Sequence, residues 1–192
     1  MNLSGCQVLA GYVSVLAVYT TLATLSTGCP WYSYPLTFFL MGCTFFGTHV
    51  AGHYPIVHAW FKAHYIGHHI YEYPRDNFDG PVYRKNKYDK WKLNMWAYII
   101  TTTPVFLLCL KLWTTTWPQV IALHGLILGP LWLENYVHME VHSNVSKWKT
   151  WPWYIYLKEY HNIHHTKHRM RKNFAIVAVF FDDLFGTAAH PT

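Results

Sequence analysis

Histidines are the residues of this sequence whose type and spacing could do chemistry. The chain has 14 of them in 192 residues, and ten fall into four short groups that read HVAGH, HYIGHH, HMEVH and HNIHH. These ten are His49, His53, His64, His68, His69, His138, His142, His161, His164 and His165. Residues three and four apart lie on one face of a helix, so each group offers at least two imidazoles toward one point.

Ten converging imidazoles could hold two first-row metal ions. Imidazole suits iron, zinc, copper and nickel, and no cysteine lies within the four groups to compete as a thiolate. A single HxxxH pair on a helix is a weak signal, because such pairs also arise by chance. Four groups at or beyond the ends of apolar segments predict a two-metal centre in which histidine dominates the ligand set.

Two carboxylates accompany the groups. Glu140 lies between His138 and His142, and Glu159 comes just before His161. A ligating histidine usually donates its second ring N–H to a carboxylate or carbonyl, which fixes the tautomer and the ring orientation. We expect this role for both carboxylates, although ordinary solvation of a helix explains them equally well.

Three of the other four histidines are expected to be solvated or interfacial. His124 is the exception, since it lies inside an apolar segment, where it could line a pocket or form a hydrogen bond between helices.

The composition indicates a membrane protein. Hydrophobic residues make up 52% of the chain and charged residues only 12%, whereas soluble domains have about 25% charged residues. No residue from position 1 to position 61 has a charged Lys, Arg, Asp or Glu side chain. Four stretches are apolar enough to span a bilayer, and they cover residues 6–25, 34–51, 93–110 and 120–133.

These stretches predict an all-α integral membrane protein with a single domain over residues 1–192. The four spans would form two hairpins, and residues 53–92 and 134–192 would form a helical cap that carries the histidine groups. The apolar segment 174–181 is too short to span, so we expect it to dock against the bundle or dip into the interface.

The basic residues predict the orientation. Of the 15 Lys and Arg residues, all but Lys111 lie in the two cap segments. The positive-inside rule therefore places the histidine groups and both termini in the cytosol, at the endoplasmic reticulum if the source is eukaryotic or viral. Nucleic-acid binding is poorly supported despite a net charge of +6, because the basic residues follow the predicted topology.

Over residues 49–187 the sequence resembles the fatty-acid hydroxylase superfamily, which includes sterol desaturases, and its pattern is nearest to fatty-acid 2-hydroxylases. The four groups come in the family's order around a hairpin. The residues YPRD at 73–76 are similar to the family's HH-x-x-P-x-D, and FDDLFGT at 181–187 resembles its W-D-x-L-F-G-T ending, after an Asn173-Phe-Ala that resembles N-Y-G.

The sequence also departs from that family pattern. Its second group reads HxxxHH where the hydroxylases mostly have HxxHH, and its first group is one residue shorter than HxxxxH. Ala175 and Phe181 stand where the family has Gly and Trp, and the proline after HYIGHH comes two residues late. These departures leave the metal site in place and leave the substrate open.

The resemblance implies two iron ions held by the ten histidines, with O2 as co-substrate and no catalytic residue beyond the metal centre. It implies insertion of oxygen into an unactivated C–H bond of a fatty acyl, sphingolipid or sterol substrate, or desaturation at the same site. Zinc could replace iron during purification. Electrons would come from a separate donor such as cytochrome b5 and its reductase, which the basic cap could steer. Asp76, Asn173 and Asp182 join Glu140 and Glu159 as candidates to surround the ligands.

A membrane protein that binds or transports metal or haem is the alternative from another class. A transporter should place polar residues across the bilayer midplane, whereas this chain places them at one edge. A haem protein needs one or two axial histidines rather than four paired groups.

Overall fold

The computed structural model describes residues 3–73, 91–114, 116–143, 146–166 and 169–191. The described chain is all-α, as predicted. Its helices are α1 (Leu3–Thr27), α2 (Ser33–Gly52), α3 (His58–Phe61), the π-helix η1 (Lys62–Glu72), α4 (Trp91–Trp113), α5 (Trp117–Val141), α6 (Pro152–His165) and α7 (Phe180–Leu184).

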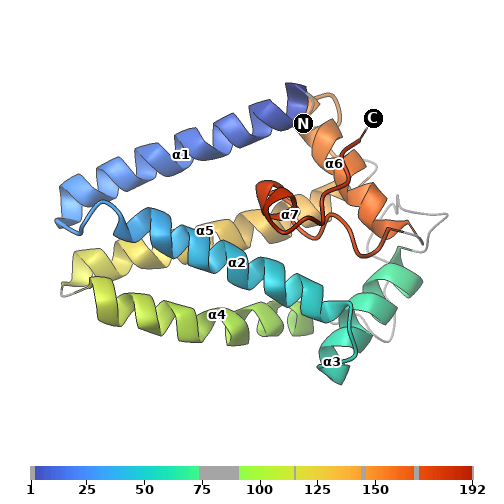
Figure 1. The fold of residues 1–192 in the computed structure, drawn as a ribbon, viewed down its shortest axis with the longest axis horizontal. Coiled ribbons are helices and arrows are strands. Elements are labelled where there is room, and N and C mark those ends of the chain that lie inside the picture. Colours follow the sequence, from blue (N-terminus) through green and yellow to red (C-terminus); the bar gives the residue numbers. More distant parts are fainter. Residues whose placement is uncertain (1–2, 74–90, 115, 144–145, 167–168, 192) are drawn as a thin grey trace.

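The four long helices α1, α2, α4 and α5 form two antiparallel hairpins that lie side by side (Figure 1). Helices α2 and α5 each contact the other three long helices and together form the centre of the bundle. The first hairpin turns at Gly28, whose φ of 68° is a conformation that glycine adopts without strain. Both hairpin turns lie at one end of the bundle, while α3, η1 and α6 gather at the other end with the N-terminal end of α1 (Figure 1).

A stripe of apolar side chains on α2 holds the bundle together. Tyr34, Phe38, Met41 and Phe45 recur at helical spacing, and each is at most 9% exposed. Residues at this spacing share one face of a helix, so α2 turns a continuous apolar surface toward its neighbours.

The predicted apolar stretches fall within α1, α2, α4 and α5, which extend beyond them. The largest extension is in α5, which continues past residue 133 to Val141 and so carries His138 on the same rigid helix. Glu134 does not end this helix, since glutamate is a good helix former, and its carboxylate accepts a hydrogen bond from the Ile176 backbone N–H at 3.2 Å. Pro104 likewise lies inside α4 without ending it.

The C-terminal segment docks against α2, one of the two arrangements expected for residues 174–181. The Phe46 ring packs against Phe174, with centroids 5.8 Å apart, and stacks on Phe185 at 4.7 Å. Phe39 contacts Phe181 at 5.8 Å. The end of the chain thus lies beside the helix that carries the first histidine group.

Among the described residues, one helix is long and apolar enough to cross a membrane, α5 at Trp117–Val141. The apolar parts of two others are shorter, at Val13–Thr27 and Ala97–Trp113.

Gly42 tests the packing of the C-terminal segment on α2. A Cβ atom at this position would collide with the ring of Phe181, which is only 1% exposed. We expect Gly42→Ala to lower the free energy of unfolding by ~1–3 kcal/mol, because overpacking shifts a buried ring.

Gly47→Ala is the matched control, since a Cβ on that helical glycine meets nothing within 4 Å. It should raise stability by about 0.5–1 kcal/mol, the usual gain when alanine replaces a helical glycine. Denaturant unfolding followed by tryptophan fluorescence in a mild detergent gives both values. Equal effects from the two substitutions would contradict the close contact at Gly42.

Candidate metal centre

The ten histidines come together in two groups of five at the end of the bundle opposite the hairpin turns. In each group the candidate ligand atoms all lie within 4.8 Å of one another. Group one consists of His49, His53, His64, His69 and His164. Group two consists of His68, His138, His142, His161 and His165. All are buried except His138, which is partly buried, so either group could hold a metal ion.

The two HH pairs connect the groups. His68 belongs to group two and His69 to group one, while His164 belongs to group one and His165 to group two. The rings of His69 and His165 lie 4.2 Å apart, in contact across the boundary. The two sites are therefore neighbours, built from shared segments.

The π-helix η1 explains how HYIGHH supplies both groups. Its backbone bonds run from residue i to residue i+5, as in the 3.0 Å bond from the Tyr73 N–H to the His68 carbonyl. This winding brings His64 and His69, five residues apart, onto the same side. The HxxxHH spacing, one residue longer than the family's HxxHH, therefore still delivers two ligands to group one.

The ring nitrogens face one another at the separation expected for ligands of one ion. The Nε2 atoms of His53 and His64 lie 3.1 Å apart in group one. In group two, His138 and His68 and also His142 and His161 show the same 3.1 Å separation. Two nitrogens at right angles on an ion with bonds of about 2.1 Å are ~3.0 Å apart.

The outer nitrogens of two group-one histidines are held by the backbone. His164 donates its Nδ1–H to the Lys172 carbonyl at 2.6 Å, which leaves its Nε2 buried among the other rings without a hydrogen-bond partner in the described chain. His49 forms a hydrogen bond with the Phe174 backbone, and its Nε2 is likewise buried and unpartnered there. Such bonds fix the tautomer that presents a lone pair to a metal.

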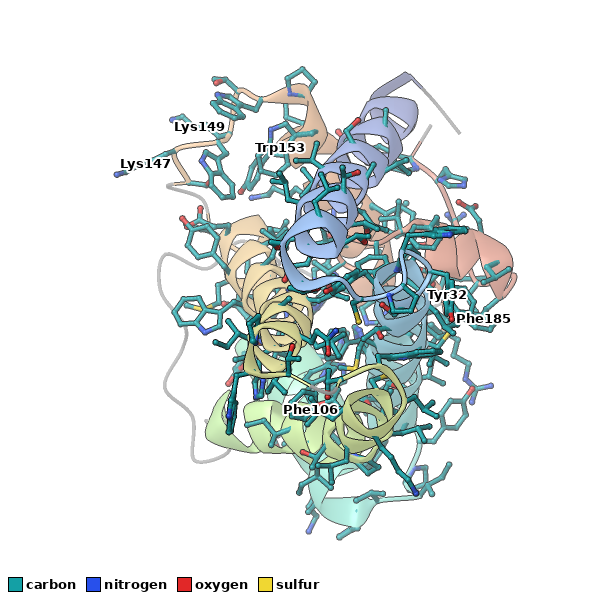
Figure 2. The ribbon with its side chains drawn as sticks, turned by 90° about the vertical axis from the view of Figure 1, so that its left-hand side faces the viewer. Tyr32, Phe106, Lys147, Lys149, Trp153 and Phe185 are labelled. Carbon is teal, nitrogen blue, oxygen red and sulfur yellow. The ribbon has the colours of Figure 1, made fainter. Side chains whose placement is uncertain are left out.

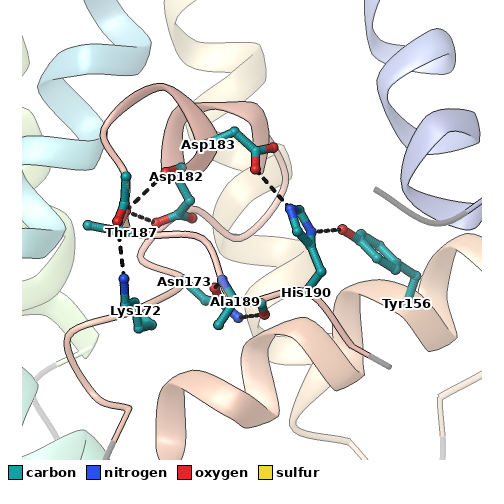
Figure 3. Close-up of polar contacts among 9 residues, drawn as sticks. Tyr156, Lys172, Asn173, Asp182, Asp183, Thr187, Ala189 and His190 are labelled. Atoms are coloured by element: carbon teal, nitrogen blue, oxygen red, sulfur yellow. Dashed lines mark hydrogen bonds and ion pairs between the residues drawn. The ribbon is translucent and has the colours of Figure 1, made fainter.

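Asn173 and Asp182 hold the backbone segment that makes these bonds (Figure 3). The Asp182 carboxylate accepts hydrogen bonds from the N–H groups of Phe174 and Ala175 at 2.8 and 2.7 Å, and from the Thr187 hydroxyl at 2.6 Å.

Asn173, whose φ is 55°, donates its side-chain amide to the Tyr160 and Ala189 carbonyls, each at 2.8 Å. Asn173 and Asp182 are both fully buried. They support the ligands through the backbone, although the sequence pattern predicted them beside the histidine rings.

Glu72 is a carboxylate at the site that the sequence reasoning missed. It is 6% exposed, and its Oε2 accepts a bond from the Nδ1 of His68 at 3.3 Å. The signal was present, because Glu72 follows His68 by four residues.

The remaining sequence candidates lie differently. Glu159 is exposed to solvent. Glu140 is partly exposed, and its backbone carbonyl accepts a bond from the Tyr154 hydroxyl at 2.7 Å, which is not a contact with a histidine ring. His124 is exposed on α5, with its ring bonded to the Val120 carbonyl of its own helix at 3.0 Å and packed on Phe106. It precedes His138 by about 21 Å along the helix, away from both groups. Asp76 lies outside the described residues.

Burial keeps four imidazoles of group one neutral. It lowers the pKa of His53, His64 and His69 well below the usual value, and the neighbouring imidazoles lower it further. Burial likewise lowers the pKa of His164 to about 3. The neutral ring is the form that ligates metal, so the folded protein presents these side chains ready to bind.

Group one has an apolar wall and a polar opening. The Phe174 ring packs edge-on against His53 and His164, with centroids 5.2 and 5.4 Å away. On another side a pocket of about 410 Å³ reaches His53 and is lined by Tyr54, Tyr65 and Arg171, among others. The Arg171 guanidinium lies 5.3 Å from the Tyr54 ring centroid.

No family model matches this chain, and neither does any curated protein or solved structure. The argument for function therefore rests on the site. A metal ion held by five imidazoles could still bind a small molecule, and two such sites in contact could act on the same molecule.

Double substitutions test the division into two groups. His49→Ala/His53→Ala removes two ligands of group one only, and His138→Ala/His142→Ala removes two of group two only. Each should reduce bound metal from about two ions per chain to about one, because a site that loses two of five ligands binds weakly. His164→Ala/His165→Ala takes one ligand from each group and should weaken both sites.

Plasma mass spectrometry of the purified, monodisperse variants measures the metal content. His58→Ala, which changes an exposed histidine outside both groups, should keep the wild-type content. Loss of all metal from each of the first two variants would show that the groups do not bind independently.

Glu72 should affect metal binding at group two by holding the ring of His68. We expect Glu72→Gln to weaken metal binding at group two by about 10–100-fold, the usual effect of removing the partner of a ligating histidine. Glu159→Gln makes the same change at an exposed carboxylate and should leave affinity unaltered. Competition with a chelator measures both, and equal affinities in the two variants would exclude this role for Glu72.

Proposed function

We propose that this chain is a membrane-embedded, non-haem di-iron oxidoreductase of the fatty-acid hydroxylase and sterol desaturase type, which hydroxylates a lipid. The observation that carries the proposal is the meeting of four sequence-distant histidine groups in two adjacent, buried sets of five. The order of these groups and the FDDLFGT ending resemble that superfamily.

Exposed apolar side chains support a membrane location for three of the four long helices. Val15, Leu25, Ile100 and Ile121 are between 66% and 79% exposed, and they come from α1, α4 and α5. A soluble monomer rarely exposes so much apolar surface on one bundle. Seen along the helix axes, side chains cover the outer faces of the bundle, and Lys147 and Lys149 project away from it (Figure 2). We infer four spans in two hairpins, with the site end in the cytosol.

The metal-transport and haem alternatives fit less well. A transport path needs polar groups through the middle of the bundle, and both histidine groups lie at one end of it, with His124 exposed on the outside of α5. A haem would require an open flat cavity beside one or two histidines, whereas here ten rings pack against one another.

When bound, two irons would supply the activation of O2 and the removal of hydrogen from an unactivated carbon. The chain's own residues would do the rest. The ten imidazoles would hold the ions, the Lys172 and Phe174 backbone orients two of the rings, and burial limits the access of bulk water to the site. Alcohol and alkene products need the same residues, so a desaturase remains the alternative within this class.

We propose a separate protein as the electron donor. The basic residues concentrate at the site end, as Lys147, Lys149 and Arg171 illustrate, and such a surface attracts an acidic protein. An acidic donor such as cytochrome b5 with its reductase fits this charge.

Lipid analysis of a yeast strain that expresses the chain tests the function. We expect one lipid fraction (fatty acid, sphingolipid or sterol) to gain a species heavier by one oxygen atom, measured by mass spectrometry. The species should disappear with His164→Ala/His165→Ala and persist with His58→Ala. A species lighter by two hydrogens would make the chain a desaturase, and metal flux without any lipid product would reject the oxidoreductase.

A further inference from the structure

An apolar groove of about 420 Å³ lies between α1, α2 and α5. Its lining is almost wholly apolar and includes Val15 and Tyr19 of α1, Phe38 of α2, and Gly129 and Leu133 of α5. The volume falls within the range of about 300–1,000 Å³ that is usual for small-molecule sites. The proposed function has no role yet for this space.

Glycines keep the groove open. A Cβ atom at Gly11 or at Gly129 would meet nothing within 4 Å. Gly125, one helical turn before Gly129, differs, since its Cβ would come within 2.9 Å of the Tyr19 hydroxyl. The GxxxG pattern of α5 therefore serves helix contact only at Gly125, while Gly129 leaves room beside the helix.

The groove leads toward group one of the histidines. Phe38 and Pro130 line both the groove and a narrow cavity of about 20 Å³, which reaches Phe46, Phe174 and Ala175. The Phe174 ring forms the last wall, because its other contacts are with His49, His53 and His164, at centroid distances of 5.2–5.7 Å.

The dimensions favour a single hydrocarbon chain. From Gly125 to Leu133 the groove follows α5 for about 12 Å. The cavity beyond it has room for about one water-sized group, so a thin methylene chain fits this passage better than a fused ring system.

We propose that this groove binds the aliphatic chain of the lipid substrate and that Gly11 and Gly129 are the residues that admit it. The inference rests on the proposed function, because it assigns the substrate of that same metal site. The chain would enter sideways from the bilayer between α1 and α5 and pass Phe38 toward Phe174, which would turn aside to expose the metal pair.

Photolabelling tests the proposal without requiring turnover. The metal-loaded protein in lipid nanodiscs is irradiated with palmitic acid that carries a diazirine near its methyl end, and labelled peptides are mapped by mass spectrometry. We expect labels on groove-lining residues of α1 and α5. Gly129→Leu, which fills the groove, should reduce this labelling by at least about tenfold, a binding loss of ~1.4 kcal/mol or more.

Gly47→Leu is the control, because it makes the same change at an open helical glycine on α2 away from the groove. It should leave labelling unchanged, and both variants should keep the wild-type metal content. Labels at the His53 and Arg171 pocket instead, or labelling that Gly129→Leu does not alter, would overturn the proposal.

Two further arms separate other occupants and other failures. If a diazirine sterol labelled the groove more strongly than the fatty acid, a sterol would be the occupant in place of an aliphatic chain. If the wild type formed a dimer that Gly129→Leu did not form, the groove would be an interface between copies of this chain. Either result rejects the proposal. Labelling that Gly129→Leu abolishes, without an oxidised lipid from the wild type, would keep the groove and reject the oxidoreductase. If Gly129→Leu formed as much oxidised lipid as the wild type, the oxidoreductase would stand and the groove would be rejected as its substrate site.

Discussion

The structure depends on the convergence of ten imidazoles, nine of them buried, at one end of the helical bundle. Each buried ring nitrogen without a hydrogen bond costs about 1–3 kcal/mol, and nitrogens such as the Nε2 atoms of His49 and His164 have no such partner within the described chain. Nothing in the helices alone would favour that arrangement. A bound cation would convert the cost into coordination, so the fold is best understood as a frame that holds these rings in place.

The fold also holds the second ring nitrogens of the histidines, which point away from the centre of each group. The Lys172 carbonyl and Glu72 take the second nitrogens of His164 and His68, and Asp182 and Asn173 hold the segment that includes Lys172 and Phe174. The C-terminal segment is therefore part of the candidate metal centre although it supplies none of the ten histidines. Its packing on α2 through Phe46 joins it to the helix that carries His49.

The site also lies at a boundary between two environments. A polar pocket with Arg171 opens at His53, and an apolar groove approaches from between α1, α2 and α5. An enzyme that oxidises a lipid needs both sides, one for an electron donor and one for a hydrocarbon chain. The histidine groups occupy the point where the helical bundle ends and the polar segments begin, which is where these two approaches meet.

The sequence by itself determined the all-α class, the positions of the long helices and the ten histidines that meet, because apolar periodicity and residue type are local properties. It also indicated Asn173 and Asp182, though not that they act through the backbone. Only the tertiary structure decided which histidine belongs to which group, since neighbours such as His68 and His69 point to different sites, and the i to i+5 winding of η1 sets the direction of His64. It likewise separated Glu72, which is 6% exposed, from the exposed Glu159, although both carboxylates lie near a histidine in the sequence. Burial distinguishes them, and burial depends on long-range packing that no local pattern contains.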